Sequence, residues 1–204
     1  MMMKKIFLLT LGIFVSFAIK AQSADEFLNS IVESYKSYDD ISIVFNYKII
    51  NEEMGVNESS RGYGSIKGNS YMINVDGQEL ICDGKTLWTH LIEDEEVMIS
   101  EVTNDDDTSP IAILNSLSNN ISTKLLSISP NITIEIVENE QSTFEKLHIN
   151  VDSNLKLKDI HIFLGDGNEL IYEIKELTTN QNLPDSMFIF DETIHPNVEV
   201  IDMR

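Results

Sequence analysis

The chain has 204 residues, of which 34 are acidic and 14 are lysine or arginine, so its formal net charge at pH 7 is −20. This charge excludes a main partner that is nucleic acid or an anionic membrane surface, because both require clustered lysine and arginine. The single cysteine, Cys82, excludes an internal disulfide, and the length fits one domain with a sizeable core.

The first 21 residues are predicted to be a cleaved signal peptide. Lys4 and Lys5 precede an apolar run over residues 6–19, and Ala21 provides a small residue for cleavage. The run is shorter than the ~20 residues of a comfortable membrane span. Because no cysteine lies near its end, we expect residues 22–204 to be exported, soluble and not lipidated. Loss of three lysines and no acids makes the net charge of this mature chain −23.

A helix is predicted over residues 24–38. Ser23 and Glu26 have the spacing of a capping box, in which each side chain binds the other residue's backbone N–H. Apolar residues then recur at helical spacing: Phe27, Leu28, Ile31, Val32, Tyr35 and Tyr38. The pattern indicates an amphipathic helix with one buried stripe.

Beyond Asp40 the period of the hydrophobic pattern changes from helical to two residues, which indicates strands. Alternating runs cover residues 41–49, 71–75, 80–82, 132–136, 147–151, 160–164 and 170–174. Asp76-Gly77, Asp83-Gly84 and Gly165-Asp166-Gly167-Asn168 separate such runs, and Asp-Gly favours a type I′ hairpin turn. We therefore expect an antiparallel meander with enough strands to curl toward a barrel.

Two further helices are predicted in the middle of the chain. Ser109 is a good N-cap and Pro110 a good first helical residue, and Ile111, Leu114 and Leu117 fall on one face. A second short helix is expected over residues 121–127. With no internal repeat or linker, the fold class is mainly β (α+β), one domain over 22–204 in which a curled antiparallel sheet carries a few helices.

The stretch from Ile81 to His90, "ICDGKTLWTH", is the strongest candidate for catalysis. Cys82 and His90 could act as nucleophile and base. However, they flank a tight turn, and nothing nearby orients the histidine or supplies an oxyanion hole. A hairpin with Asp83-Gly84 at its tip explains the stretch better, so we predict a turn, no catalytic residue and no enzyme.

Metal and cofactor sites are not predicted. Asp105-Asp106-Asp107 lacks the alternating ligands, glycine and distant glutamate of an EF-hand, and is better explained as a solvated acidic loop. The four histidines are scattered, without the spacing of zinc ligands. The sequence also contains no phosphate-binding loop and no dinucleotide-binding motif.

The alternating strands give the sheet one apolar face rich in aromatic residues, which are Phe45, Tyr47, Tyr71, Tyr172, Phe188 and Phe190. A small barrel fills such a face with its own side chains, whereas a wider one leaves room for an apolar ligand. Periodicity alone leaves both possibilities open.

Several motifs resemble the LolA family of periplasmic outer-membrane lipoprotein carriers. Asp83-Gly84-Lys85-Thr86-Leu87-Trp88 is similar to the family's "DGKTLW" hairpin, and residues 62–67, "GYGSIK", resemble its Gly-rich strand. Thr108-Ser109-Pro110 opens a helix where those carriers have a similar start. Residues 188–191 and 196–200 resemble the closing "FxF…P…V" segment. The likeness covers nearly the whole mature chain.

The resemblance implies an incomplete β-barrel closed by a lid of about three helices over an apolar cavity. It also implies a periplasmic chaperone that carries acyl chains of lipoproteins from the inner to the outer membrane, without cofactor or catalysis. The implied partners of the monomer are acylated lipoproteins, an ATP-driven lipoprotein-releasing complex in the inner membrane and an unidentified outer-membrane acceptor. Where the family commonly has Lys-Arg-Pro, with the arginine latching the lid, this chain has Lys67-Gly68-Asn69.

The residues predicted to line the acyl-chain cavity come from the first helix, the strands and the central helix. They are Phe27, Ile31, Ile43, Phe45, Tyr47, Tyr71, Ile73, Val75, Trp88, Ile111 and Leu114. An error of one residue in strand phase would turn a strand's set outward. The main alternative function is an envelope lipid-sensing or regulatory binding module on the same fold. A domain with a filled core that acts by surface contacts and a secreted hydrolase are further alternatives.

Overall fold

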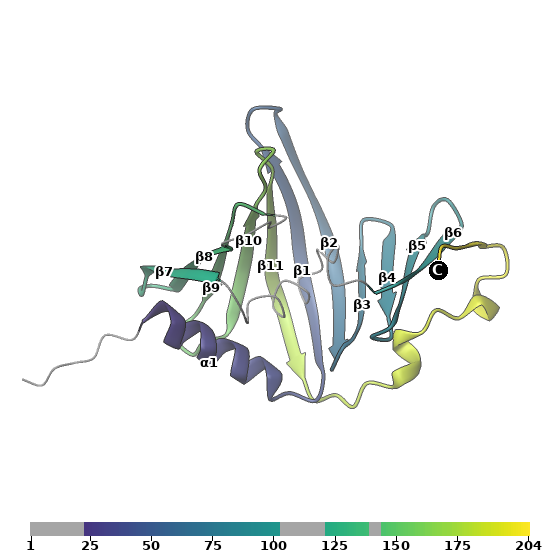
Figure 1. Cartoon of the computed structure of the whole chain (residues 1–204), viewed down its shortest axis with the longest axis horizontal. Coiled ribbons are helices and arrows are strands. Elements are labelled where there is room, and N and C mark those ends of the chain that lie inside the picture. The colour runs from purple at the N-terminus through teal and green to yellow at the C-terminus, as the bar shows by residue number, and fades with distance from the viewer. Residues whose placement is uncertain (1–22, 103–120, 139–143) are drawn as a thin grey trace, which may run out of the picture.

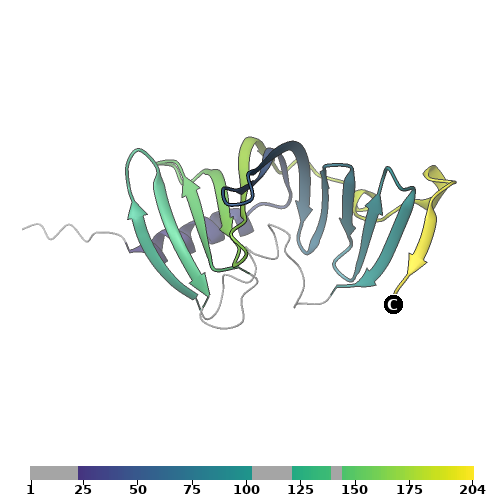
Figure 2. The same cartoon turned by 90° about the horizontal axis from the view of Figure 1, so that it is seen from above.

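The computed structural model describes residues 23–102, 121–138 and 144–204, which form one twelve-stranded sheet. Its strand order is β12-β6-β5-β4-β3-β2-β1-β11-β10-β9-β8-β7. All neighbours are antiparallel except β12 and β6, which are parallel. The sheet is curved but open, because its edge strands β12 and β7 do not pair with each other (Figures 1 and 2).

The strands are β1 (Ile41–Asn51), β2 (Val56–Lys67), β3 (Ser70–Val75), β4 (Gln78–Cys82), β5 (Thr86–Leu91), β6 (Glu96–Glu101), β7 (Ile121–Ser127), β8 (Ile132–Glu138), β9 (Lys146–Val151), β10 (Leu157–Phe163), β11 (Glu169–Thr179) and β12 (Glu199–Asp202). The described residues also form one α-helix, α1 (Ala24–Lys36), and two short 3₁₀ helices, η1 (Asp185–Phe188) and η2 (Glu192–Ile194). The predicted mainly β class is confirmed.

Helix α1 begins and packs as the sequence predicts. The Ser23 hydroxyl accepts from the Glu26 backbone N–H and the Glu26 carboxylate accepts from the Ser23 N–H, both at 3.2 Å, which confirms the capping box. Leu28 and Ile31 are buried against strands β8, β9 and β10, and the helix lies beneath this flank of the sheet in Figure 1. The helix therefore covers only one half of the sheet.

The hairpin turns follow the sequence in part. Asp76 and Gly77 both have positive φ, 56° and 75°, as a type I′ turn requires, so that prediction is confirmed. At Asp83-Gly84 only the glycine has positive φ, so the type I′ prediction is wrong there. The Asp83 carboxylate instead accepts from the backbone N–H groups of Lys85 and Thr86, both at 2.8 Å. The Asp83 N–H donates to the Thr86 carbonyl at 3.3 Å, so the turn is centred on Gly84 and Lys85.

The predicted lid of about three helices requires correction. The helix expected to start at Ser109 lies outside the described residues. The helix predicted over residues 121–127 is wrong, because this segment forms strand β7 and pairs with β8. Exposure alternates with a period of two from Ser122 to Ser127, which suits a strand on the edge of a sheet.

Two faces of the sheet differ in chemistry. We call the face that packs on α1 the inner face. It carries a cluster around α1, β8, β9 and β10 and a second cluster around Phe45, Tyr71, Ile73 and Cys82. Tyr172 and Ile174 contact both clusters, so the apolar surface of the inner face is continuous. The opposite, outer face carries a smaller cluster of Ile81, Val97 and Phe190.

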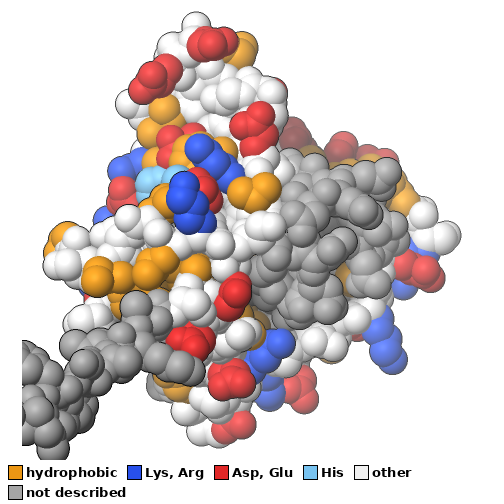
Figure 3. Space-filling model, turned by 60° about the vertical axis from the view of Figure 1, so that its left-hand side comes forward, with side chains coloured by type: hydrophobic (Ala, Val, Ile, Leu, Met, Phe, Trp, Pro, Cys, Tyr) orange, Lys and Arg blue, Asp and Glu red, His pale blue; other side chains and the backbone are white. Residues whose placement is uncertain are grey.

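On strands β8–β11 the outer face is polar. His148 lies 3.1 Å from Glu135, and His161 lies between Asp159, at 3.1 Å, and Glu169, at 2.6 Å. Figure 3 shows histidine side chains here among acidic and basic ones. The hydrogen bond with Asp159 outweighs burial and raises the pKa of His161. The outer face of β8–β11 therefore offers apolar ligands no surface comparable to the inner face of the same strands.

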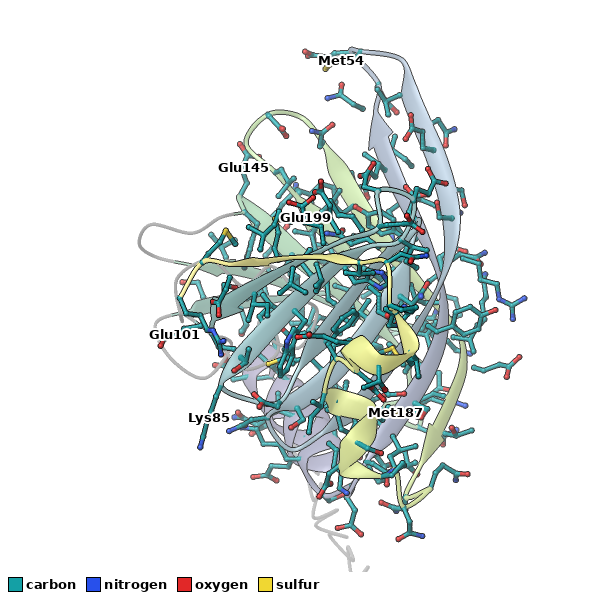
Figure 4. All side chains as sticks on the ribbon, turned by 90° about the vertical axis from the view of Figure 1, so that its right-hand side faces the viewer. Met54, Lys85, Glu101, Glu145, Met187 and Glu199 are labelled. Atoms are coloured by element: carbon teal, nitrogen blue, oxygen red, sulfur yellow. The ribbon has the colours of Figure 1, made fainter. Side chains whose placement is uncertain are left out.

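Residues 180–202, here called the C-terminal strap, cross the outer face of the other flank (Figure 4). Helix η1 packs against β3, and Phe188 and Phe190 are buried there, 2% and 6% exposed. The strap ends as β12, which pairs with β6. The two strands are parallel because the chain crosses the sheet before it pairs. The strap thus covers strands that α1 does not reach.

Gly62 in β2 allows the ring of Phe45 to lie directly against the backbone of the neighbouring strand. A Cβ atom at this position would lie 2.4 Å from Cζ of Phe45, whose ring is 1% exposed. We expect Gly62→Ala to lower the free energy of unfolding by about 1–3 kcal/mol, as overpacked cores do. Urea unfolding followed by circular dichroism measures this change. Gly165→Ala, whose Cβ would meet nothing closer than 4.0 Å, is the control, and equal stability losses in both variants would contradict the role of the Phe45 contact.

Candidate functional site

An apolar cavity in the described part of the chain lies on the inner face, between α1 and strands β1, β2, β3, β10 and β11, and has a volume of about 300 Å³. Its lining residues are Ile31, Val32, Tyr35, Lys36, Tyr38, Asp39, Asp40, Ile41, Ile43, Phe45, Gly64, Ile66, Gly68, Asn69, Ile73, Leu157, Ile160, Tyr172, Ile174 and Leu177. The volume lies at the lower end of the range for ligand pockets.

Aliphatic side chains from facing strands form most of the wall, and aromatic rings close one end. The rings of Phe45 and Tyr172 have centroids 5.6 Å apart, and those of Tyr47 and Tyr172 are 5.0 Å apart. Tyr47 and Tyr172 are direct partners in the pairing of β1 with β11. Gly64 leaves space beside Ile43, because a Cβ there would lie 3.0 Å from Ile43 Cγ1. The cavity is therefore shaped by residues of the sheet itself.

The opposite end of the cavity has a polar rim, built around Asp40 between α1 and β1. Asp40 is 2% exposed, and its carboxylate accepts from the backbone N–H groups of Gln181 at 2.7 Å and Leu183 at 3.0 Å. Burial on its own would raise the pKa of the Asp40 carboxyl, but these backbone donors lower it below its ordinary value, and Lys67 adds to the decrease. Asp40 thereby attaches the start of the C-terminal strap to the rim.

Lys67 makes a second attachment of the strap. Its ammonium group donates to the Leu183 carbonyl at 2.7 Å and lies 2.6 Å from the Asp185 carboxylate. This lysine precedes Gly68-Asn69, where the sequence departs from the Lys-Arg-Pro of the resembling carriers. In this chain it is Lys67, the first residue of the Lys67-Gly68-Asn69 segment, that binds the strap.

Apart from Trp88, the predicted cavity residues fall into three groups. Ile31, Ile43, Phe45 and Ile73 line the cavity. Tyr47, Tyr71 and Val75 belong to the adjoining inner-face cluster, and Phe27 packs against the cluster at α1. Ile111 and Leu114 lie outside the described residues.

Trp88 lies on the outer face and is a correction to the predicted set. It packs near Ile81 and Phe190 and not on the cavity. Because Leu87, the preceding residue, pairs with Cys82 and contacts the inner cluster, alternation along β5 turns Trp88 outward. The expectation of an inward Trp88 had the strand phase wrong by one residue.

Sequence reasoning missed much of the wall contributed by β10 and β11. Leu157, Ile160, Ile174 and Leu177 line the cavity. The predicted strands contained Ile160 and Ile174, without a role in the cavity, and did not extend to Leu157 or Leu177. The available signal was the alternation in residues 170–174, which puts Tyr172 and Ile174 on one face. Its continuation to Leu177 is broken by an irregularity in the pairing of β1 with β11 between Val44 and Phe45.

Cys82 and His90 do not meet. Cys82 is fully buried in the inner cluster, whereas the His90 ring packs on the outer face against Phe190 and His195, with centroids 5.2 and 4.8 Å away. The "ICDGKTLWTH" stretch is thus a hairpin, as predicted. Within the described ranges no three His, Cys, Asp or Glu side chains are grouped as metal ligands.

No helix among the described residues is long and apolar enough to cross a membrane.

The architecture defines a class, in which one open, curved antiparallel sheet holds an apolar cavity on its inner face. A crystal structure of an uncharacterised conserved protein from Thermus thermophilus has this fold, with a TM-score of 0.56, 9% identity, and 88% of this chain and 99% of that chain covered. Residues 72–191 match the family model described as "Outer membrane lipoprotein carrier protein LolA". The chain belongs to the LolA family.

Curated relatives agree over almost the full length. This chain is 25% identical over 207 aligned residues to an outer-membrane lipoprotein carrier protein of Francisella tularensis subsp. tularensis, with 98% of both chains covered. It is 26% identical over 208 residues to the protein of the same name from Francisella philomiragia, again with 98% of both covered. Proteins of this family are periplasmic carriers rather than enzymes, so the prediction of a non-enzymatic protein is confirmed.

Proposed function

We propose that this protein binds acyl chains of outer-membrane lipoproteins in the inner-face cavity and carries them from the inner to the outer membrane. Membership of the LolA family supports lipoprotein cargo. The observation that carries the proposal is the cavity between α1 and the sheet, walled by Ile31, Ile43, Ile160 and Ile174 and closed at one end by Phe45. The proposal includes export by the signal peptide expected over residues 1–21.

Volume decides how much cargo the described cavity holds. An apolar cavity of ~150 Å³ holds one benzene molecule, so a cavity of about 300 Å³ holds roughly a dozen carbon atoms. At about 0.8 kcal/mol for each buried CH₂, such a segment gains on the order of 10 kcal/mol. A second acyl chain requires that α1 and the sheet separate further. Loading also requires an energy-using membrane partner, for which the family's ATP-driven releasing complex is the proposed source.

A charge in the cavity tests the proposal. We expect Ile43→Glu to reduce lipid binding more than tenfold, because an unpaired carboxylate is costly in an apolar cavity. The wild type and variant are purified from the periplasm, and bound acylated protein is measured by lipid mass spectrometry, with an apolar fluorescent dye as a second probe. Circular dichroism establishes that the variant is folded.

Val44→Glu is the matched control. Val44 is the next residue of β1 and pairs with Tyr63, which is 49% exposed, so its side chain points to the outer face. This variant is expected to retain wild-type binding. If both variants bind alike, the cavity is not the site. If dye binds but no acylated protein is recovered from the wild type, the lipid-sensing alternative is favoured instead.

A further inference from the structure

Tyr172 of β11 lines the cavity wall beside aliphatic side chains of β10 and β11, and its hydroxyl group has no hydrogen-bond partner in the described structure. Tyr35, another phenol on the wall, accepts a hydrogen bond from the Leu157 backbone N–H at 2.9 Å. For Tyr172, the described residues provide ring contacts with Phe45 and Tyr47 but no hydrogen bond. Its hydroxyl therefore remains available as a donor.

The Tyr172 oxygen is also not fully enclosed by the protein. Every fully enclosed polar side-chain atom in the described ranges has a hydrogen-bond partner. Since the Tyr172 oxygen has none, it is not fully enclosed, and Tyr172 is one of the residues that line the cavity. Burial raises the pKa of the Tyr172 phenol above its ordinary value, with a smaller contribution from Tyr47, so the group stays protonated as a donor.

A ligand that fills the cavity covers this hydroxyl, and a hydroxyl that is buried without a partner costs about 1–3 kcal/mol. An acceptor on the ligand removes this cost. We propose that the Tyr172 hydroxyl donates a hydrogen bond to the carbonyl group of a bound acyl ester or amide, and that the cavity selects neutral acyl derivatives over plain hydrocarbon and over free fatty acids. This inference rests on the proposed function of the cavity.

Charges on the wall explain the discrimination against free fatty acids. Lys36 is the only cation among the described lining residues, and Asp39 and Asp40 lie at the same polar rim. No cation lines the end where Tyr172 contacts Phe45 and Tyr47. A carboxylate there would lose its hydration with only one neutral donor in return, which is unfavourable in an apolar environment. An ester carbonyl carries no such charge.

Probes of about a dozen carbons match the size of the cavity. Methyl laurate presents an ester carbonyl, methyl dodecyl ether has the same chain without a carbonyl, and laurate carries a carboxylate. Their binding to the wild-type protein is measured by displacement of an apolar fluorescent dye. We expect methyl laurate to bind about fivefold more tightly than the ether, the effect of one net hydrogen bond. Laurate is expected to bind most weakly.

Tyr172→Phe is expected to abolish the preference for the ester and to leave ether binding unchanged. Tyr63→Phe removes a phenol from the outer face, away from the cavity, and is the control, with the preference retained. Equal binding of ester and ether to the wild type, or an unchanged preference in Tyr172→Phe, overturns the inference while the carrier function stands. If none of the three probes binds, the proposed function and this inference both fail.

Discussion

Replacing Phe45 with alanine is expected to lower the free energy of unfolding by about 3–5 kcal/mol, the usual cost of deleting a buried phenylalanine ring. Phe45 is 1% exposed, lies over Gly62 and contacts Tyr172, so its ring joins β1, β2 and β11. The ring also closes one end of the cavity. Urea unfolding followed by circular dichroism measures the stability change, and dye binding measures the loss of the cavity wall.

Tyr63→Ala is the control, because this residue neighbours Gly62 in β2 but is 49% exposed. It removes an aromatic ring from the other face, and we expect a change within about 0.5 kcal/mol. The double variant Phe45→Ala/Gly62→Ala sharpens the test. Once the ring is gone, the added methyl group meets no obstacle, so the two effects are expected not to add. Additive effects would show that Gly62 and Phe45 do not restrict each other.

Replacing Asp40 with alanine is expected to release the C-terminal strap from the cavity rim. The variant leaves the buried N–H groups of Gln181 and Leu183 without their carboxylate acceptor, and unpaired buried donors are costly. We expect the melting temperature to fall by several degrees. Hydrogen exchange is expected to accelerate at Gln181 and Leu183 and at the β12 amides, because β12 is held to the sheet through the strap.

Asp39→Ala is the matched control, since only the backbone N–H of Asp39 binds the strap, through the Asn180 side chain at 2.9 Å. Exchange rates as slow as wild type at Gln181 in Asp40→Ala would contradict the role of the carboxylate.

Unfolding in acid provides an independent test of the Asp40 carboxylate. Because the folded pKa of Asp40 is lowered, its contribution is complete above its ordinary value of 3.8 and is lost as pH falls through the folded value. In Asp40→Ala, the free energy of unfolding is therefore expected to fall less between neutral and acid pH than in the wild type.

Local sequence patterns predicted the elements whose hydrogen bonds and burial are local. The Ser23–Glu26 capping box, the helix at α1 and the Asp76-Gly77 turn all depend on residues a few positions apart. The segment 121–127 was assigned to the wrong element because its pairing with β8 depends on a partner strand that periodicity does not identify. A short apolar segment fits either a helix or a strand until its neighbours are known.

The candidate site was predicted in part for the same reason. Ile43, Phe45 and Ile73 follow from alternation along β1 and β3, which fixes a common face once one member is known to be buried. Trp88 required the phase of β5, which its pairing with β4 fixes by placing Leu87 opposite Cys82 and Trp88 opposite Ile81. The contribution of Asp40 was not predictable, because its partners lie about 140 residues further along the chain.

The parallel pairing of β12 with β6 also constrains how this protein is made. β6 is synthesised long before β12, and until the later segment arrives one of its edges has unsatisfied backbone donors and acceptors. Such an edge can recruit a strand from another nascent molecule and start aggregation. Glutamates at both ends of β6, Glu96 and Glu101, provide like charges that oppose such mispairing during biogenesis.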